Sequence, residues 1–167
     1  MSNSLPWPAL GAVTLPLVGS TLVSYYLGGT PGPWAETLKT PKWRPPRMAF
    51  PIVWSGLYTG MGYASYLVWK DGGGFEGPAQ LPLAMYGAQL ALNFSWSPIF
   101  FGMHSLKGAF INILLLDVAA AWTAYRFHEV TPLAGYLMLP YLVWLSLATA
   151  LNYRIWQDNS DDETKTD

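Results

Sequence analysis

The residues best suited to chemistry in this 167-residue chain are tryptophans and side-chain amides that recur at helical spacing. Gln89, Asn93 and Trp96 follow one another at i, i+4 and i+7, so they share one face of a helix. Trp54 and Tyr58 are one helical turn apart. Such groups combine apolar surface with a few hydrogen-bonding atoms, which is the usual lining of a small-molecule site.

A third stripe lies near the C-terminus. Trp144, Ala148 and Leu151 share one helical face, with Asn152 beside them. Three stripes that face inward would form a largely apolar pocket with a few polar groups. The alternative is that the amides only join neighbouring helices by hydrogen bonds. Spacing alone does not separate these two interpretations.

Asp117 is the single charged residue between Gly108 and Tyr125. Charged groups at bilayer depth are rare and often functional. A lone carboxyl group without a basic partner or a proton-relay chain is more simply explained as a protonated side chain that is hydrogen-bonded to another helix. The sequence gives Asp117 no definite role.

Enzyme-like constellations are absent from the sequence. There is no cysteine, which excludes a thiolate metal site. His104 and His128 are separated by a predicted span and so cannot share a metal ion or a catalytic triad. The glycines at 72–74 lack the Lys-Ser/Thr pair of a phosphate-binding loop. We therefore predict a binding protein, not an enzyme, with no cofactor and no metal site.

The elements that position these residues are predicted from the charges, which make up only 11% of the chain against about 25% in soluble domains. No charged side chain occurs in residues 1–35, 51–69, 77–106 or 130–153. A helix needs about 20 residues to cross a hydrocarbon core of about 30 Å. The sequence thus predicts an all-α integral membrane bundle of five transmembrane helices, at about residues 6–27, 49–69, 80–101, 108–127 and 132–153.

The predicted bundle occupies residues 1–157, and residues 158–167 form an acidic, polar tail that we expect to be disordered. Basic residues favour one side of the membrane, namely Lys39, Lys42, Arg44, Arg47, Lys107, Arg154 and Lys165. The positive-inside rule then places the first loop and the tail in the cytoplasm. The net charge of −1 gives no indication of a nucleic-acid partner.

The first loop is rich in proline yet contains Trp34, Trp43 and Phe50. One interpretation is that it packs over the cytoplasmic end of the bundle and closes a cavity. The other is that its tryptophans belong to the aromatic belt at the membrane interface.

Four long segments resemble a known family, and they read KTPKWRPPRMAFPIVW, GLYTGMGYASYLVWK, QLALNFSWSPIFFG and PYLVWLSLATALNYRIWQDN. With the residues between them they cover about residues 34–159. They resemble the translocator protein (tryptophan-rich sensory protein) family, also called peripheral-type benzodiazepine receptors, and are closer to its animal members.

This resemblance implies a five-helix membrane protein, often a homodimer, with receptor-like binding of cholesterol and of porphyrins such as protoporphyrin IX or haem. Synthetic benzodiazepine- and isoquinoline-type ligands are further expected partners. The implied function is sterol or tetrapyrrole transport or sensing in the mitochondrial outer membrane, or in a bacterial membrane for a bacterial member. The alternative function is a light- and oxygen-dependent porphyrin-degrading activity that uses paired tryptophans.

The resemblance also implies which residues contact ligand. The matching positions of the pocket under the first loop are Trp54, Asn93, Trp96, Trp144, Ala148 and Leu151. Among these, Trp54 and Trp144 match the two indoles tied to porphyrin chemistry. The family's sterol motif falls on Leu151, Tyr153 and Arg154.

Two positions depart from the family pattern. Gly108 stands where animal members usually carry a ligand-contacting tryptophan, which we expect to enlarge or open the pocket. Gln157 replaces the usual basic residue of the sterol motif, and Arg154 follows Tyr153 without a spacer.

Overall fold

The computed structural model describes residues 6–29 and 31–163, and within them the fold is all-α. Five helices have 18 residues or more, and they are α1 (Trp7–Tyr26), α3 (Ala49–Asp71), α4 (Gln80–Ser97), α5 (Leu106–Val130) and α7 (Leu139–Glu163). Three short elements join them, namely α2 (Pro33–Glu36), the π-helical turn η1 (Pro98–Gly102) and α6 (Pro132–Leu137).

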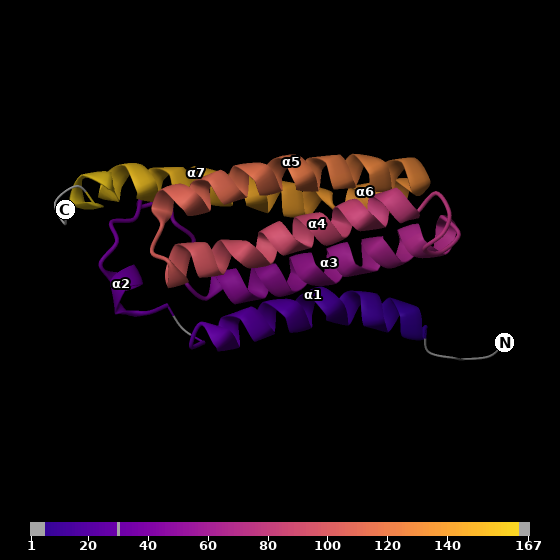
Figure 1. The fold of residues 1–167 in the computed structure, drawn as a ribbon, viewed down its shortest axis with the longest axis horizontal. Helices are drawn as coiled ribbons and strands as arrows, with labels where there is room; N and C mark the ends of the chain where they lie inside the picture. The colour runs from indigo at the N-terminus through magenta and orange to yellow at the C-terminus, as the bar shows by residue number, and fades with distance from the viewer. Residues whose placement is uncertain (1–5, 30, 164–167) are drawn as a thin grey trace.

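The long helices run side by side as one elongated bundle (Figure 1). α5 and α7 form one side, α3 and α4 lie in the middle, and α1 lies on the opposite side. α2 and the end of α7 lie at the same end of the bundle, while the α3–α4 connection lies at the other. α1 is the most weakly embedded long helix, because only Ala9 and Pro16 are buried in it.

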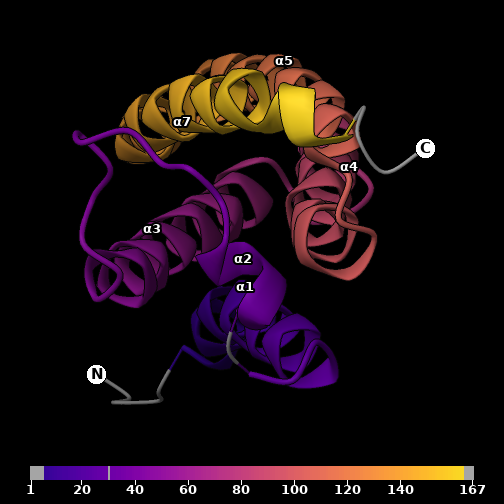
Figure 2. The same ribbon diagram turned by 90° about the vertical axis from the view of Figure 1, so that its left-hand side faces the viewer.

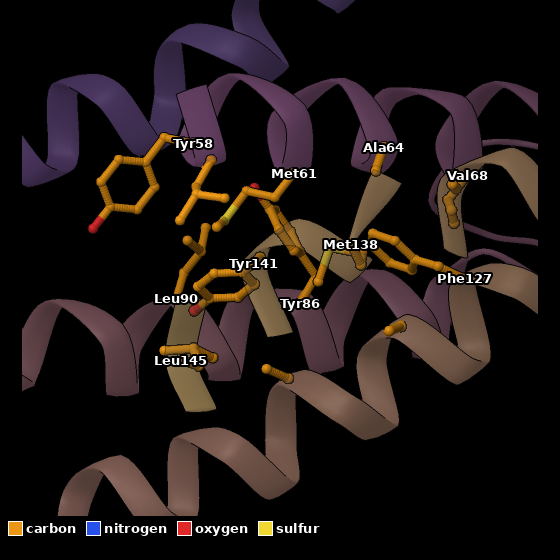
Figure 3. Close-up of a cluster of buried hydrophobic side chains, with 14 of the residues drawn as sticks. Tyr58, Met61, Ala64, Val68, Tyr86, Leu90, Phe127, Met138, Tyr141 and Leu145 are labelled. Carbon is orange, nitrogen blue, oxygen red and sulfur yellow. The ribbon is translucent and has the colours of Figure 1, made fainter. Parts of the chain in front are cut away.

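A core of interlocking apolar and aromatic side chains holds α3, α4, α5, α6 and α7 together (Figure 3). Met61 and Val68 of α3 and Phe127 of α5 are completely buried. Glycine allows the closest backbone approach to α1, because a Cβ on Gly62 would lie 2.5 Å from the Ala12 carbonyl oxygen. Helices in lipid associate through this kind of close packing.

Two prolines interrupt helices that the sequence predicted as continuous. Pro98 has no N–H to donate to the Phe94 carbonyl, and the α-helix changes there into the η1 turn. Pro140 likewise cannot donate to Tyr136, and the predicted fifth span is divided into α6 and α7 at Met138.

The predicted disordered tail needs a correction. α7 continues to Glu163, so residues 158–163 are helical. Arg154 and Asp158 support this extension with an ion pair of 3.3 Å one turn apart. Residues 164–167, Lys165 among them, lie outside the described residues.

Three stretches of the described chain are long and apolar enough to cross a membrane, namely Trp7–Tyr26, Leu106–Val130 and Pro132–Ser160. α3 and α4 have comparable lengths but are not among these stretches. α4 carries Gln89 and Asn93 in its middle, and α3 is rich in glycine, serine and tyrosine. The fold is therefore a helical bundle with three clear membrane-spanning candidates, and five spans remain a prediction.

Candidate functional site

A chain of three hydrogen bonds lies at the centre of the bundle. The Tyr58 hydroxyl donates to Asn93 Oδ1 at 2.6 Å, and Asn93 Nδ2 donates to the Tyr141 hydroxyl at 2.9 Å. The Tyr141 hydroxyl in turn donates to Gln89 Oε1 at 2.8 Å. All four side chains are at most 7% exposed. The network joins α3, α4 and α7 where water cannot replace a lost partner.

Sequence reasoning missed Tyr141, although it precedes Trp144 by three residues on the same helical face. It also left open whether the amides line a pocket or join helices. Gln89 is completely buried, and its Nε2 lies 3.9 Å from Met61 Sδ. In this structure Gln89 joins helices, whereas Tyr58 and Asn93 both join helices and border a cavity.

This cavity has a volume of about 230 Å³ and lies between the second half of α1, α3 and α4, next to the connection that follows α1. Polar groups from three elements line it, including Ser20 and Ser24 of α1, Tyr58 of α3, and Asn93 and Ser97 of α4. The rings of Phe94 and Phe101 complete the apolar part.

The two tryptophans expected in porphyrin chemistry lie along the contact between α3 and α7. Trp54 stacks on Tyr58 with ring centroids 5.2 Å apart and meets Tyr141 edge-on at 6.1 Å. Trp144 meets Phe50 of α3 edge-on at 5.6 Å. Both indoles are half-buried. The Trp144 N–H is buried and has no acceptor among the described residues.

Trp96 and Leu151 lie in a second cluster near the α2 end of the bundle. The Trp96 N–H donates to Asn152 Oδ1 at 2.8 Å, and Asn152 Nδ2 donates to the Leu106 carbonyl at 3.4 Å. Trp96 also stacks on Phe100 at 4.7 Å. Leu151 is buried here, whereas Ala148 packs on the central core. The predicted ligand residues thus form two neighbouring groups along the bundle axis.

We call residues 31–48, between α1 and α3, the lid. Trp34 of the lid stacks on His104 with centroids 4.2 Å apart and planes 10° apart, and it meets Phe100 edge-on. Trp43 is 49% exposed. Of the two interpretations of the loop tryptophans, packing over the end of the bundle therefore describes Trp34, as the path of the chain in Figure 2 illustrates.

The Asn159 side chain of α7 forms hydrogen bonds to the backbone of the lid. The Lys39 N–H donates to Asn159 Oδ1 at 3.0 Å, and Asn159 Nδ2 donates to the Lys39 carbonyl at 3.0 Å. A further bond from Nδ2 to the Ile155 carbonyl at 2.7 Å fixes the amide, which is only 6% exposed. Sequence reasoning had placed Asn159 in the disordered tail, where no such role is visible.

The three residues matched to the sterol motif do not lie together. Leu151 faces the inner cluster, whereas Tyr153 is 47% exposed and packs against Phe110 at 5.4 Å. Arg154 is exposed and pairs with Asp158. Gln157 is exposed as well.

Two other residues singled out from the sequence have local roles. Gly108 donates its N–H to Ser105 Oγ at 3.0 Å in the first turn of α5, and a Cβ on Gly108 would lie 2.6 Å from that oxygen. Asp117 Oδ2 accepts a hydrogen bond from the Thr149 hydroxyl at 2.7 Å, which links α5 to α7.

Long apolar helices around an interior of tyrosine, amide and indole groups define a multi-pass membrane protein. Residues 12–157 match the TspO/MBR family, and the chain belongs to this family. It is 46% identical over 155 residues to "Translocator protein" of Bos taurus, covering 92% of each chain. It is 40% identical to "Translocator protein 2" of Canis lupus familiaris, covering 88% of this chain and 86% of that protein. "Protein CrtK" of Rhodobacter capsulatus is 38% identical, with 82% and 85% covered. The resemblance predicted from the sequence is confirmed.

Proposed function

We propose that the protein is a five-span, receptor-like membrane protein that binds porphyrins and cholesterol and takes part in their transport or sensing. The observation that carries this proposal is the aromatic contact of α3 with α7, where the buried Trp144 N–H has no acceptor. The site lies beside a cavity and near a lid. We infer a mitochondrial outer-membrane location, because mammalian translocator proteins are among the most similar relatives.

The lengths and the packing of α3 and α4 support the proposal of five spans. At 1.5 Å per residue, 23 and 18 residues give helices of about 35 and 27 Å, close to the thickness of a hydrocarbon core. Tyr58 and Asn93 are buried and bond to each other across the two helices. The exposed hydroxyls of Ser55, Thr59 and Ser95 donate to carbonyls of their own helices. These groups are satisfied without water, as a bilayer favours, whereas the buried Trp69 N–H of α3 has no acceptor among the described residues.

A porphyrin is flat and aromatic, with acceptor groups at its rim, and the site offers matching chemistry. Trp54 and Trp144 supply two half-buried indole rings, and the Trp144 N–H would donate to such an acceptor once binding uncovers it. Neither indole lines the neighbouring 230 Å³ cavity, which reaches the site only through Tyr58 and is smaller than the range of about 300–1,000 Å³ for small-molecule sites. Binding therefore involves movement of the lid or of α1. Synthetic benzodiazepine- and isoquinoline-type ligands would use the same site.

For cholesterol, the proposed contact is the outer face where α5 and α7 meet. Phe110 of α5 and Tyr153 and Trp156 of α7 form an aromatic surface there, with ring centroids 5.4 to 6.4 Å apart. The proposed homodimer would use the exposed face of α4, where Ala84, Ala88 and Ala91 leave room for close helix approach.

The porphyrin site is tested by exchanging its indoles. Trp54→Phe and Trp144→Phe should each weaken protoporphyrin IX binding about fivefold, since a stacked aromatic pair contributes about 1 kcal/mol beyond area burial. Trp122→Phe is the control, because Trp122 is 54% exposed on α5. Fluorescence quenching in detergent gives the dissociation constants. Unchanged affinity in the double variant would show that porphyrin binds elsewhere.

The second candidate function is light-dependent porphyrin degradation. The same two indoles favour it, because an electron-rich ring near the bound macrocycle can donate an electron to its excited state, with dissolved oxygen as the final oxidant. Phenylalanine fills this role poorly. Under illumination, the Phe variants should therefore lose porphyrin absorbance far more slowly than the parent at equal porphyrin occupancy. Equal rates would leave binding as the only function of the site.

A further inference from the structure

A second cavity, of about 320 Å³, lies at the end of the bundle opposite the lid. It is bounded by the end of α3, the α3–α4 connection and the last turn of α5, which meet at one end of the molecule (Figure 1). Asp71, Arg126 and Glu129 supply its charged lining, and Pro78, Pro82 and Val130 supply apolar walls. Its size falls within the range of small-molecule sites. None of these residues belongs to the porphyrin site.

The charges around this cavity favour a cation. Asp71 is the last residue of α3, and Glu129 lies in the last turn of α5. The C-termini of α3 and α5 and the N-termini of α4 and α6 all lie at this end, so their partial charges largely cancel. The charged lining is then two carboxylates against one guanidinium, which leaves a net negative charge. Asp71 has no ion pair within the described part of the chain. His128, also in the last turn of α5, packs against the Tyr136 ring with centroids 5.3 Å apart.

The Arg126 guanidinium could bind an anionic group of the same ligand. Its Nη1 lies 2.9 Å from Glu129 Oε2, and its side chain is 32% exposed. The Nε of the same guanidinium is buried and has no acceptor among the described residues. A guanidinium that is only partly paired can donate hydrogen bonds to phosphate oxygens. The lining thus matches a ligand with adjacent positive and negative groups, and it disfavours a simple anion.

We propose that this cavity binds the headgroup of an ethanolamine phospholipid. The ammonium lies between Asp71 and Glu129, the phosphate contacts Arg126, and the apolar walls contact the glycerol end. A primary ammonium donates three hydrogen bonds to such carboxylates, which a choline group cannot do. The position favours a lipid, because α3 and α5 both end here and the apolar side chains of Leu81 and Leu133 are more than half exposed nearby.

The test uses the purified full-length chain in detergent and measures lipid binding by native mass spectrometry. The ligands are phosphatidylethanolamine, phosphatidylcholine, phosphatidylglycerol and free phosphoethanolamine. We expect phosphatidylethanolamine to bind most tightly. Asp71→Asn and Glu129→Gln should each weaken its binding about two- to fivefold, as expected for ion pairs of exposed carboxylates. Lys70→Gln is the matched control, because Lys70 is exposed at the same end but does not line the cavity.

Several results would overturn the proposal. Equal or tighter binding of phosphatidylglycerol would show that the cavity selects anions. Free phosphoethanolamine binding as tightly as the lipid would remove the lipid assignment. Unchanged phosphatidylethanolamine binding in both carboxylate variants would place the lipid elsewhere. Asp71→Asn leaves the Arg126–Glu129 pair intact, so this variant decides the question even if changes on α5 impair folding.

Discussion

Replacing Tyr141 with phenylalanine should destabilise the bundle more than the same change at Tyr58. The Tyr141 hydroxyl both accepts from Asn93 and donates to Gln89. The Tyr58 hydroxyl makes only the bond to Asn93 in this network. Tyr141→Phe therefore removes two buried hydrogen bonds and leaves two amide atoms without partners, whereas Tyr58→Phe removes one bond.

The expected loss of unfolding free energy follows from the contribution of a single interhelical hydrogen bond in a membrane protein. Interhelical hydrogen bonds contribute about 0.6 to 1.7 kcal/mol each there, so Tyr141→Phe should cost about 1 to 3 kcal/mol. Tyr58→Phe should cost about half as much. Because the aromatic ring remains in both variants, loss of packing does not obscure the comparison.

Unfolding of each variant in mixed micelles with increasing dodecyl sulfate, followed by circular dichroism, gives the free energies of unfolding. A double-mutant cycle between positions 58 and 141 then measures their coupling, which should be clearly different from zero because Asn93 bonds to both hydroxyls. Equal, small losses in both single variants with no coupling would refute the idea that this network holds α3, α4 and α7 together.

Three further predictions concern the lid, the sterol contact and the topology. Asn159→Ala removes the backbone clamp and should speed porphyrin dissociation in stopped-flow measurements without changing helicity; an unchanged rate would mean that the lid does not gate the site. Gln157→Arg should increase crosslinking of a photoactivatable cholesterol and Tyr153→Ser should reduce it, and no effect of either would place the sterol elsewhere. Single cysteines at positions Lys42 and Lys107 should react with an impermeant maleimide from the cytoplasmic side, and labelling only after permeabilisation would reverse the orientation.

Much of the architecture could be predicted because bilayer chemistry constrains the sequence strongly. Long stretches without charges gave the positions of the long helices, and α1 and α3 begin within one residue of the expected bounds. The breaks at Pro98 and Pro140 were missed, although the lack of a proline N–H gives a local reason for both. The end of α7 was placed too early, because a polar sequence beyond the membrane carries no hydropathy signal.

The candidate site was predictable only in part, because partners across helices depend on rotation and register. Helical spacing placed Asn93 on an inward face but did not identify Tyr141 as its acceptor. The stack of Trp34 on His104 and the clamp of Asn159 on the lid join segments far apart in the chain. No periodicity within one helix contains such information. Which ligand these residues contact stays a prediction.

Mapping the contacts of bound porphyrin tests the proposed site most directly. A protoporphyrin analogue that carries a photoreactive diazirine would be bound to the full-length protein in detergent and irradiated, and the modified peptides would be identified by mass spectrometry. The proposed site predicts modification of α3 and α7 within about one turn of Trp54 and Trp144, with competition by unlabelled protoporphyrin IX. Labelling confined to the exposed face of α5 around Trp122, or to Tyr153, would contradict it.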